Sequence, residues 1–249
     1  MEKGQDNHPL VSIIIPTLNE EKLISQTLSQ FTPSLKSKYN FEIIISDGGS
    51  ADSTLSLVKT YADKVLVSKP NEKQNISIGR NMGASFAKGN LLYFMNADTR
   101  IMDVNYFFKV TSEIFENDSI AALTFKIKIF PEEEKLSDKL FHFCYNNYVY
   151  LLNKLGMGMG RGECQIVRKD IFLKAGGYNE AIAAGEDYDL YRRIKKIGRV
   201  KYLRDITIYE SPRRFRRYGY LNVFRDWTKN SFSIFFKNKS VSKDWKEVR

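Results

Sequence analysis

Short apolar runs rich in β-branched residues alternate with helix-like segments over the first 95 residues, and this alternation constrains the fold most strongly. The runs are too short for helices and end at Pro, Gly, Asp or Asn, so they predict buried strands at residues 10–15, 41–45, 64–67 and 91–95. Helices are expected between them, at residues 20–31, 52–61 and 75–87. Strands and helices in this order predict βαβ units, and hence an α/β fold with a mainly parallel central sheet flanked by helices.

The second half of the chain is less regular. We expect helices at residues 103–117, 136–155 and 187–197, and strands at residues 165–168 and 200–209. Residues 120–130 fit either a single strand or one arm of a hairpin. The glycine-rich segment at residues 156–162 fits a flexible lid over an acceptor or a plain loop, and it lacks the Lys-Ser/Thr of a phosphate-binding loop.

Polar residues follow the predicted strands at the edge where a parallel sheet binds its ligands, in residues 16–20, 47–50 and 96–99. Asp47 and Asp98 would face the same crevice there. Strand-end carboxylates can hold a divalent cation against a diphosphate and accept hydrogen bonds from ribose hydroxyls. An isolated Asp more often caps a turn, so the surrounding sequence has to decide.

Five segments together resemble the motifs of the family-2 glycosyltransferases, in the order in which that family carries them. They are VSIIIPTLNE at residues 11–20, SDGGSADST at 46–54, GRNMGASFAKG at 79–89, LLYFMNADT at 91–99, and GGYNE at 176–180 followed by GEDYDL at 185–190 with Arg193. The resemblance extends over residues 10–220 and implies the GT-A fold, a Rossmann-like sheet that binds a nucleotide sugar.

The resemblance places the nucleotide-sugar donor on the N-terminal half of the site. Asp47 matches the carboxylate that contacts the base or ribose, and Asp98 matches the last position of the DxD motif, which ligates Mn²⁺ or Mg²⁺ and meets the diphosphate. The first position of that motif is Asn96 here, which brings no charge, and Arg80 would reach the nucleotide or orient a carboxylate. The same donor site would include Pro16, Thr17, Asn19, Glu20, Gly48 and Ala97. UDP is the expected nucleotide, with GDP next.

Asp187 matches the family's general base in the Glu-Asp pair. The chemistry agrees, because an acceptor hydroxyl must lose a proton as it attacks the anomeric carbon. Neither His8 nor His142 lies in a motif, which disfavours a histidine base. The alternative is that the pair is the acidic first turn of a helix, favoured by the helix dipole. We expect Asp189 to be structural, and expect Gly162, Glu163 and Glu186, with Cys164 and Gln165, on the acceptor side.

The densest positive charge is SPRRFRRYGY at residues 211–220. It resembles a stretch that follows the last strand in one bacterial and archaeal branch of the family. Arginines bind phosphate in a bidentate manner, so Arg213 and Arg214 are expected to clamp the diphosphate. The alternative is a basic surface facing a membrane or solvent. The Q-x-x-R-W motif of processive members is absent, which argues against a polymer-extruding synthase.

Residues 221–249 form a predicted C-terminal extension to a glycosyltransferase domain at residues 1–220. The pattern at residues 220–236 is an amphipathic helix that would pack on the domain, on a partner such as a second copy in a homodimer, or on an anionic membrane surface.

Composition and charge indicate the compartment and the partners. A net charge of +10 favours an anionic partner. No motif for nucleic-acid binding is present, so nucleic acid is not expected. The chain has two cysteines, and residues 1–9 are polar and lack a signal-like apolar run. These features favour a cytoplasmic protein, which could also attach peripherally to the inner face of the cell membrane.

The function predicted from these features is inverting, metal-assisted transfer of a sugar from a nucleotide diphosphate to a hydroxyl of a saccharide or lipid-linked acceptor. A polyprenyl-phosphate glycosyl synthase is the nearest alternative, because its phosphate acceptor needs no base. A nucleotidyltransferase could share the sheet and the metal but would release pyrophosphate. A non-catalytic basic binding module is disfavoured by the motifs.

Overall fold

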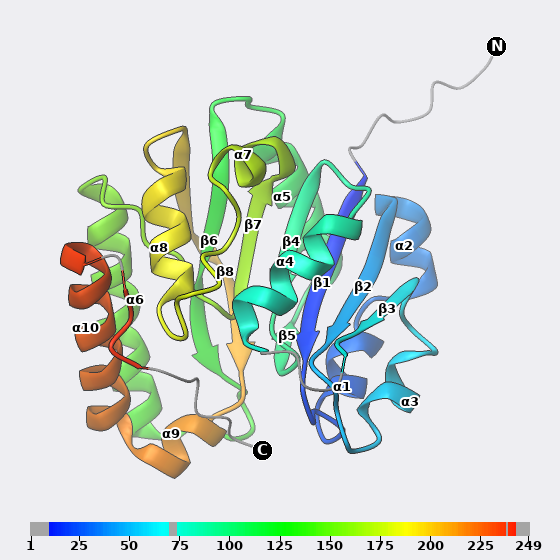
Figure 1. The fold of residues 1–249 in the computed structure, drawn as a ribbon, viewed down its shortest axis with the longest axis horizontal. Helices are drawn as coiled ribbons and strands as arrows, with labels where there is room; N and C mark the ends of the chain where they lie inside the picture. Colours follow the sequence, from blue (N-terminus) through cyan, green and yellow to red (C-terminus); the bar gives the residue numbers. More distant parts are fainter. Residues whose placement is uncertain (1–9, 70–73, 238, 243–249) are drawn as a thin grey trace.

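The computed structural model describes residues 10–69, 74–237 and 239–242. Its described strands form one sheet in the order β3-β2-β1-β4-β7-β6-β8-β5 (Figure 1). The strands are β1 Val11–Thr17, β2 Phe41–Asp47, β3 Lys64–Val67, β4 Leu91–Met95, β5 Thr99–Ile101, β6 Ile120–Ile129, β7 Cys164–Arg168 and β8 Arg199–Glu210.

The sheet is mixed. The strands β3, β2, β1 and β4 are parallel to one another, as the N-terminal pattern predicts. The strand β7 then runs antiparallel to both β4 and β6, while β8 is parallel to β6 and antiparallel to β5. The expectation of an α/β sheet flanked by helices is therefore confirmed. Only the N-terminal half of the sheet has all its strands parallel.

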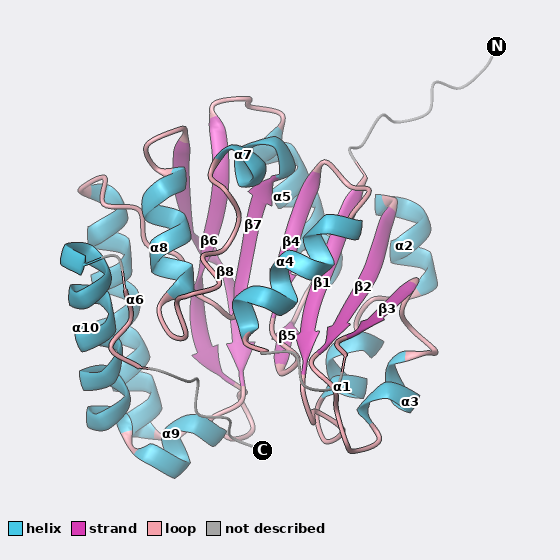
Figure 2. Ribbon diagram, viewed as in Figure 1, coloured by secondary structure: helices cyan, strands magenta, loops and turns pink. Residues whose placement is uncertain are grey.

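Helices cover both faces of the sheet (Figure 2). One face packs on α1 Ile24–Ser29, α2 Pro33–Tyr39, α3 Thr54–Val58 and α5 Val104–Phe115, and the other on α4 Ile76–Phe86, α7 Lys169–Lys174 and α8 Glu186–Ile194. Side chains alternate along β1, so Ile13 and Ile15 join the first layer while Ile14 joins the second. Burial on both faces explains why these strands read as continuous apolar runs.

Three further helices, α6 Leu136–Lys154, α9 Arg213–Tyr218 and α10 Tyr220–Lys237, lie together beyond the β6–β8 side of the sheet (Figure 1). Val223, Trp227 and Ile234 of α10 pack into apolar clusters with residues of α6 and α9. The domain boundary near residue 220 stays a prediction. No helix among the described segments has the length and apolar character needed to cross a membrane.

Several boundaries differ from those expected. The helix at residues 20–31 is shortened to α1, because residues 20–23 form turns in which the Glu20 amide donates to Thr54 Oγ1 at 2.7 Å. Residues 120–129 form a single strand, so the hairpin alternative is wrong. The short elements α2, β5, α7 and α9 were not predicted, since each is shorter than the stretch over which a hydrophobic period can be recognised.

Candidate active site

A pocket lies at the carboxyl ends of β1, β2 and β4 and extends to the inner sides of α6 and α10. Most of the predicted site residues line it, although they come from distant parts of the sequence. These are Pro16, Thr17, Glu20, Gly48, Arg80, Asn96, Ala97, Asp98, Gly162, Glu163, Glu186, Asp187, Arg213 and Arg214. The structure thus brings together the donor-side and acceptor-side groups predicted separately.

Two predicted donor residues, Asn19 and Asp47, are not part of the pocket lining. Asp47 is fully buried: its Oδ2 accepts from Thr17 and Ser50 hydroxyls, and its Oδ1 accepts from the Gly49 and Ser50 amides. Asn19 has a φ of 52° and accepts a hydrogen bond from the Ala51 amide through Oδ1. Both side chains fasten the β1 and β2 loops to each other, and Asp47 accepts four hydrogen bonds within the protein. The direct donor contact predicted for these two residues stays a prediction.

Arg213 lies between the carboxylates of the donor side. Its guanidinium donates to both carboxylate oxygens of Glu20, at 2.8 and 2.9 Å, and lies 3.1 Å from Oδ2 of Asp98. Burial lowers the pKa of the adjacent Arg214, and Glu210 and Asp98 oppose that shift. The first turn of α9 therefore brings two guanidinium groups to the end of β4, where a diphosphate would need positive charge.

The residues around Asp98 fit a divalent cation only in partnership with a substrate. No three carboxylate, histidine or cysteine side chains converge on one point in the part of the chain that the structure describes. Asp98 supplies one hard oxygen ligand, and Glu210 Oε1 is buried and accepts no hydrogen bond there. Mg²⁺ is commonly held by one or two carboxylates together with substrate phosphates, so this donor set fits a cation bridged by a nucleotide.

Arg80 connects the two sides of the pocket. Its side chain is fully buried and donates to Glu186 Oε1 at 3.0 Å, Asn96 Oδ1 at 3.0 Å and the Gly162 carbonyl at 2.7 Å. It thereby fixes the segment before Asp98, the glycine-rich loop and the start of α8 relative to one another. Of the two roles predicted for Arg80, the geometry matches the orienting of a carboxylate. The side-chain oxygen of the uncharged Asn96 accepts a hydrogen bond from this arginine.

Asp187 faces the pocket at the N-terminus of α8. Its Oδ1 accepts a hydrogen bond from the Tyr188 amide at 2.8 Å. Burial, followed by the negative charges of Glu186 and Glu163, raises the pKa of Asp187 to about 7. A carboxylate held in this way is a competent proton acceptor near neutral pH. Asp189 instead points to Arg193, with an ion pair of 2.7 Å, as expected for a structural residue.

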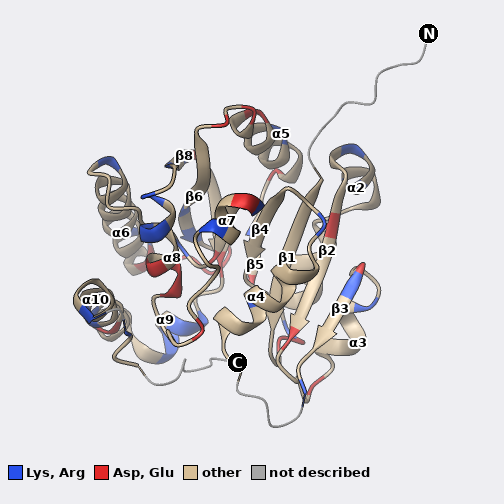
Figure 3. Ribbon diagram, turned by 45° about the horizontal axis from the view of Figure 1, so that its top comes forward, with Lys and Arg blue, Asp and Glu red and all other residues tan. Residues whose placement is uncertain are grey.

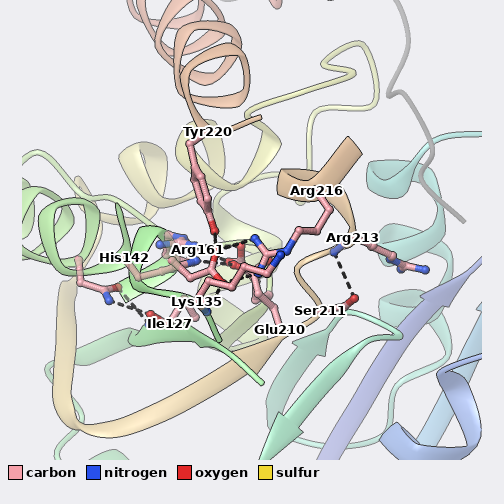
Figure 4. Close-up of polar contacts among 12 residues, drawn as sticks. Ile127, Lys135, His142, Arg161, Glu210, Ser211, Arg213, Arg216 and Tyr220 are labelled. Atoms are coloured by element: carbon pink, nitrogen blue, oxygen red, sulfur yellow. Dashed lines mark hydrogen bonds and ion pairs between the residues drawn. The ribbon is translucent and has the colours of Figure 1, made fainter. Parts of the chain in front are cut away.

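A charge cluster, which we define as Arg161, Glu163, Glu210 and His142, lies at the pocket. Arg161, Glu163 and Glu210 line the pocket and His142 is buried; Figure 4 labels Arg161, Glu210 and His142. Arg161 pairs with Glu163 at 3.0 Å and with Glu210 at 3.5 Å. Burial and the Glu163 charge raise the pKa of Glu210 well above its usual range, and burial with Arg161 lowers the pKa of His142 to about 3. Arg161 and Glu210 were missed by sequence analysis. The only signal for Glu210 was its place directly before the basic run.

The pocket also has an aromatic wall that the sequence did not reveal. Tyr145 of α6 and Trp227 of α10 line it, with ring centroids 5.2 Å apart, and the Arg161 guanidinium lies 4.7 Å from the Tyr145 ring. The sequence predicted an aromatic-rich helix around Tyr145 and an amphipathic helix around Trp227. Only the packing of these two helices places the two rings at the pocket.

The glycine-rich segment is packed against α8. A side chain at Gly158 would come within 2.6 Å of the Tyr191 carbonyl, and one at Gly160 within 2.6 Å of the Tyr191 ring. The residues of α8 occupy the space around this part of the loop, and whether the segment acts as a lid or a plain loop stays a prediction. Cys164 and Gln165 are buried in β7 and do not line the pocket, so the acceptor contacts expected for them are not supported.

Arg216 and Tyr220, later in the basic segment at residues 211–220, hold helices together. Arg216 donates to Asp138 Oδ1 of α6 at 2.7 Å, and Tyr220 also donates to that carboxylate (Figure 4). Although burial opposes the shift, these hydrogen bonds lower the pKa of Asp138 to about 2. They attach α9 and α10 to α6, which holds Arg213 and Arg214 at the pocket.

Comparison with known proteins agrees with this geometry. Residues 12–176 match the model of the family described as glycosyl transferase family 2. An uncharacterized glycosyltransferase of Haemophilus influenzae is 26% identical over 200 residues, which are 74% of this chain and 62% of that protein. The matched stretches cover 21% and 62% of two of the curated relatives, so the chain spans less than two thirds of their length.

Solved structures of glycosyltransferases share the fold. A mannosyltransferase of Pyrobaculum calidifontis in complex with GDP-mannose and Mn²⁺ superposes with a TM-score of 0.64 at 17% identity, covering 83% of this chain and 58% of that one. TarS residues 1–349 of S. aureus in complex with UDP-GlcNAc gives a TM-score of 0.59 at 19% identity, covering 81% and 58%. The sequence motifs, the sheet with its strand-end pocket and the family match over residues 12–176 agree, and the chain belongs to glycosyl transferase family 2 as a GT-A glycosyltransferase.

Proposed function

We propose that this enzyme transfers a sugar from a nucleotide-diphosphate sugar to an acceptor hydroxyl in a single displacement with inversion. The observation that carries the proposal is that one pocket holds two different sets of groups. Asp187, with a pKa raised to about 7, lines it, and so do Asp98 and the basic residues Arg213 and Arg214. A base on the acceptor side and positive charge on the leaving-group side are what an in-line displacement needs.

In this mechanism the acceptor oxygen attacks the anomeric carbon from the Asp187 side. The bond between the anomeric carbon and the β-phosphate oxygen breaks, and the hydroxyl proton passes to the Asp187 carboxylate. Arg214, and Arg213 if it releases Glu20, would bind the departing diphosphate. Arg80 keeps Glu186 and Gly162 in register with Asp98 throughout, since it touches both sides. Binding and orientation of the two substrates by these residues would lower the barrier further.

We propose Asp98 as the protein ligand of a divalent cation, Mn²⁺ or Mg²⁺, with Glu210 close by. When bound, such an ion would neutralise charge on the diphosphate. The Mn²⁺ in the Pyrobaculum structure supports this proposal. Asp98 is ion-paired to Arg213, so cation binding would require this arginine to turn toward the phosphates.

The donor is proposed to be a UDP-sugar, or next a GDP-sugar, because the two structural relatives hold UDP-GlcNAc and GDP-mannose. The acceptor is proposed to be a hydroxyl of a saccharide or of a lipid-linked glycan. Trp227 and Tyr145 support this choice, since an aromatic wall beside the base can pack against the apolar face of a sugar ring.

The test is a thermal-shift screen of UDP, GDP, CDP and dTDP, each with and without Mn²⁺ or Mg²⁺. A ligand that binds only the folded state stabilises it by about 2.7 kcal/mol at 100 times its dissociation constant. We expect one nucleotide to give a metal-dependent shift, and Asp98→Ala to lose that metal dependence. Asp170→Ala, an exposed carboxylate on α7, is the matched control and should behave as wild type. No shift with any nucleotide would contradict the proposal.

A further inference from the structure

The outer side of α6 is apolar although its inner side already belongs to the core. Leu136, Leu140, Phe143 and Leu151, with Leu155 at the C-cap, are 51% to 82% exposed. Their spacing of three, four or eight residues puts them on one side of the helix. The opposite side buries Asp138, His142, Tyr145, Asn146 and Val149. An exposed stripe of this length has no role in the packing of the described chain.

Helix α10 also carries apolar side chains on its outer side. Leu221, Phe224, Phe232, Phe235 and Phe236 are 44% to 86% exposed, while Val223, Asn230 and Ile234 face inward. Of the nineteen large apolar side chains that are exposed in the described residues, eleven belong to α6, its C-cap or α10. Single exposed apolar residues are ordinary, but a gathering of this kind marks an interaction site.

The two stripes form one surface, which we call the α6–α10 face. The helices lie side by side (Figure 1) and are joined by Tyr145, whose ring centroid is 5.2 Å from Trp227 and 6.3 Å from Phe224. Phe224 is thus both an exposed member of the α10 stripe and a contact of α6. The contact between the two helices is therefore aromatic, and it brings the exposed stripe of α10 next to α6.

The charges on and around this face are mainly positive. Arg225 and Lys229 lie within the α10 stripe by helical position, and Lys139 and Lys154 are exposed on α6 (Figure 3). The acidic residue of α6, Asp138, is buried and paired with Arg216, whereas Asp226 of α10 is exposed beside Arg225. A second copy of the same face would bring like charges together, whereas an anionic surface would attract them.

We propose that the α6–α10 face docks on the surface of an anionic lipid bilayer. Phe and Leu side chains would enter the headgroup boundary, and Arg225 and Lys229 would meet the anionic headgroups, as in helices that lie in a membrane interface. The pocket is lined by Tyr145 and Trp227 from the inner sides of the same two helices. Docking would therefore hold the pocket beside the bilayer and favour a membrane-borne acceptor, a consequence that rests on the proposed function.

The test is flotation of the full chain with two kinds of vesicle: phosphatidylcholine with phosphatidylglycerol, and phosphatidylcholine alone. We expect binding to the anionic vesicles that weakens with salt. The double variant Leu140→Ser with Phe232→Ser should bind at least about tenfold more weakly, given the apolar area removed. The matched control is Leu173→Ser with Phe86→Ser. Leu140 and Leu173 are both 65% exposed on helices, but Leu173 and Phe86 lie on α7 and α4.

Three outcomes would overturn the proposal: no binding of the wild-type chain to anionic vesicles, equal loss of binding in the control variant, or a lipid-free dimer that the face variant converts to monomer in analytical ultracentrifugation. Folding of each variant is checked by its melting temperature. Nucleotide-induced thermal shifts should be unchanged in the face variant, because none of its substitutions lines the pocket. Loss of vesicle binding with retained nucleotide binding therefore tests docking separately from glycosyl transfer.

Discussion

The loop after β2 and the first turn of α8 treat their carboxylates in opposite ways. At the end of β2, Asp47 accepts four hydrogen bonds from Thr17, Gly49 and Ser50, so its charge is fully compensated within the protein. At the start of α8, Asp187 accepts one hydrogen bond and lies near two other carboxylates, and its pKa rises to about 7. A compensated carboxylate holds loops in place, whereas a crowded one is able to exchange a proton.

The largest effect is expected at Asp187. Asp187→Asn keeps the shape of the side chain but removes the proton acceptor, so transfer should fall by about 10²- to 10⁴-fold while donor binding persists. Steady-state kinetics and nucleotide thermal shifts measure the two quantities. Asp189→Asn, in the same helical turn but paired with Arg193, is the control and should retain most of its activity. Full activity of Asp187→Asn would instead favour a phosphate acceptor that needs no base.

Arg80 connects the start of α8 to the glycine-rich loop and to Asn96, so its removal should destabilise the folded protein. Arg80→Met would leave Glu186 without its cation and the Gly162 carbonyl without a donor. Breaking a buried pair of this kind costs about 3–5 kcal/mol of unfolding free energy, which urea denaturation would measure. Arg199→Met, at an exposed position that begins β8, is the control. A stable variant that merely binds nucleotide weakly would mean that Arg80 acts on the donor.

Asp47→Asn separates a loop-fixing role from a donor-binding role. If the four hydrogen bonds are the purpose of Asp47, the variant should lose about 1–3 kcal/mol of unfolding free energy, because buried donors are left poorly paired. Its nucleotide affinity, measured by calorimetry below the melting temperature, should stay close to wild type. Unchanged stability with a large loss of affinity would restore the direct donor contact that the family resemblance implies.

The smallest effect is a pH dependence. Because the carboxylate form of Asp187 accepts the proton and its pKa is raised to about 7, kcat/KM should fall about tenfold for each pH unit below that value and level off above it. Pre-steady-state transfer measured across this range would show the step. A profile that stays flat through pH 7 would contradict the crowded environment described for this residue.

The N-terminal half of the fold was predictable because its information is local. The strands β1, β2 and β4 are buried on both faces and read as apolar runs, and all four parallel strands were located to within about two residues at each end. The site residues at their ends followed from the rule that parallel strands present their carboxyl ends to one crevice. Asp98 was chosen in this way, whereas Asp187 and Arg213 were chosen from the family resemblance, and all three line the pocket.

The remaining features depend on contacts between residues far apart in the chain. The sequence determined an α/β sheet, the strand-end crevice and the set of charged groups near it, because period and motif are properties of short segments. Only the tertiary structure decided that Asp47 is enclosed by its own loop, that Glu210 pairs with Arg161 at the pocket, and that α6 and α10 pack against each other. Burial and electrostatic environment are set by every element that packs around a group, and no single segment of sequence contains that information.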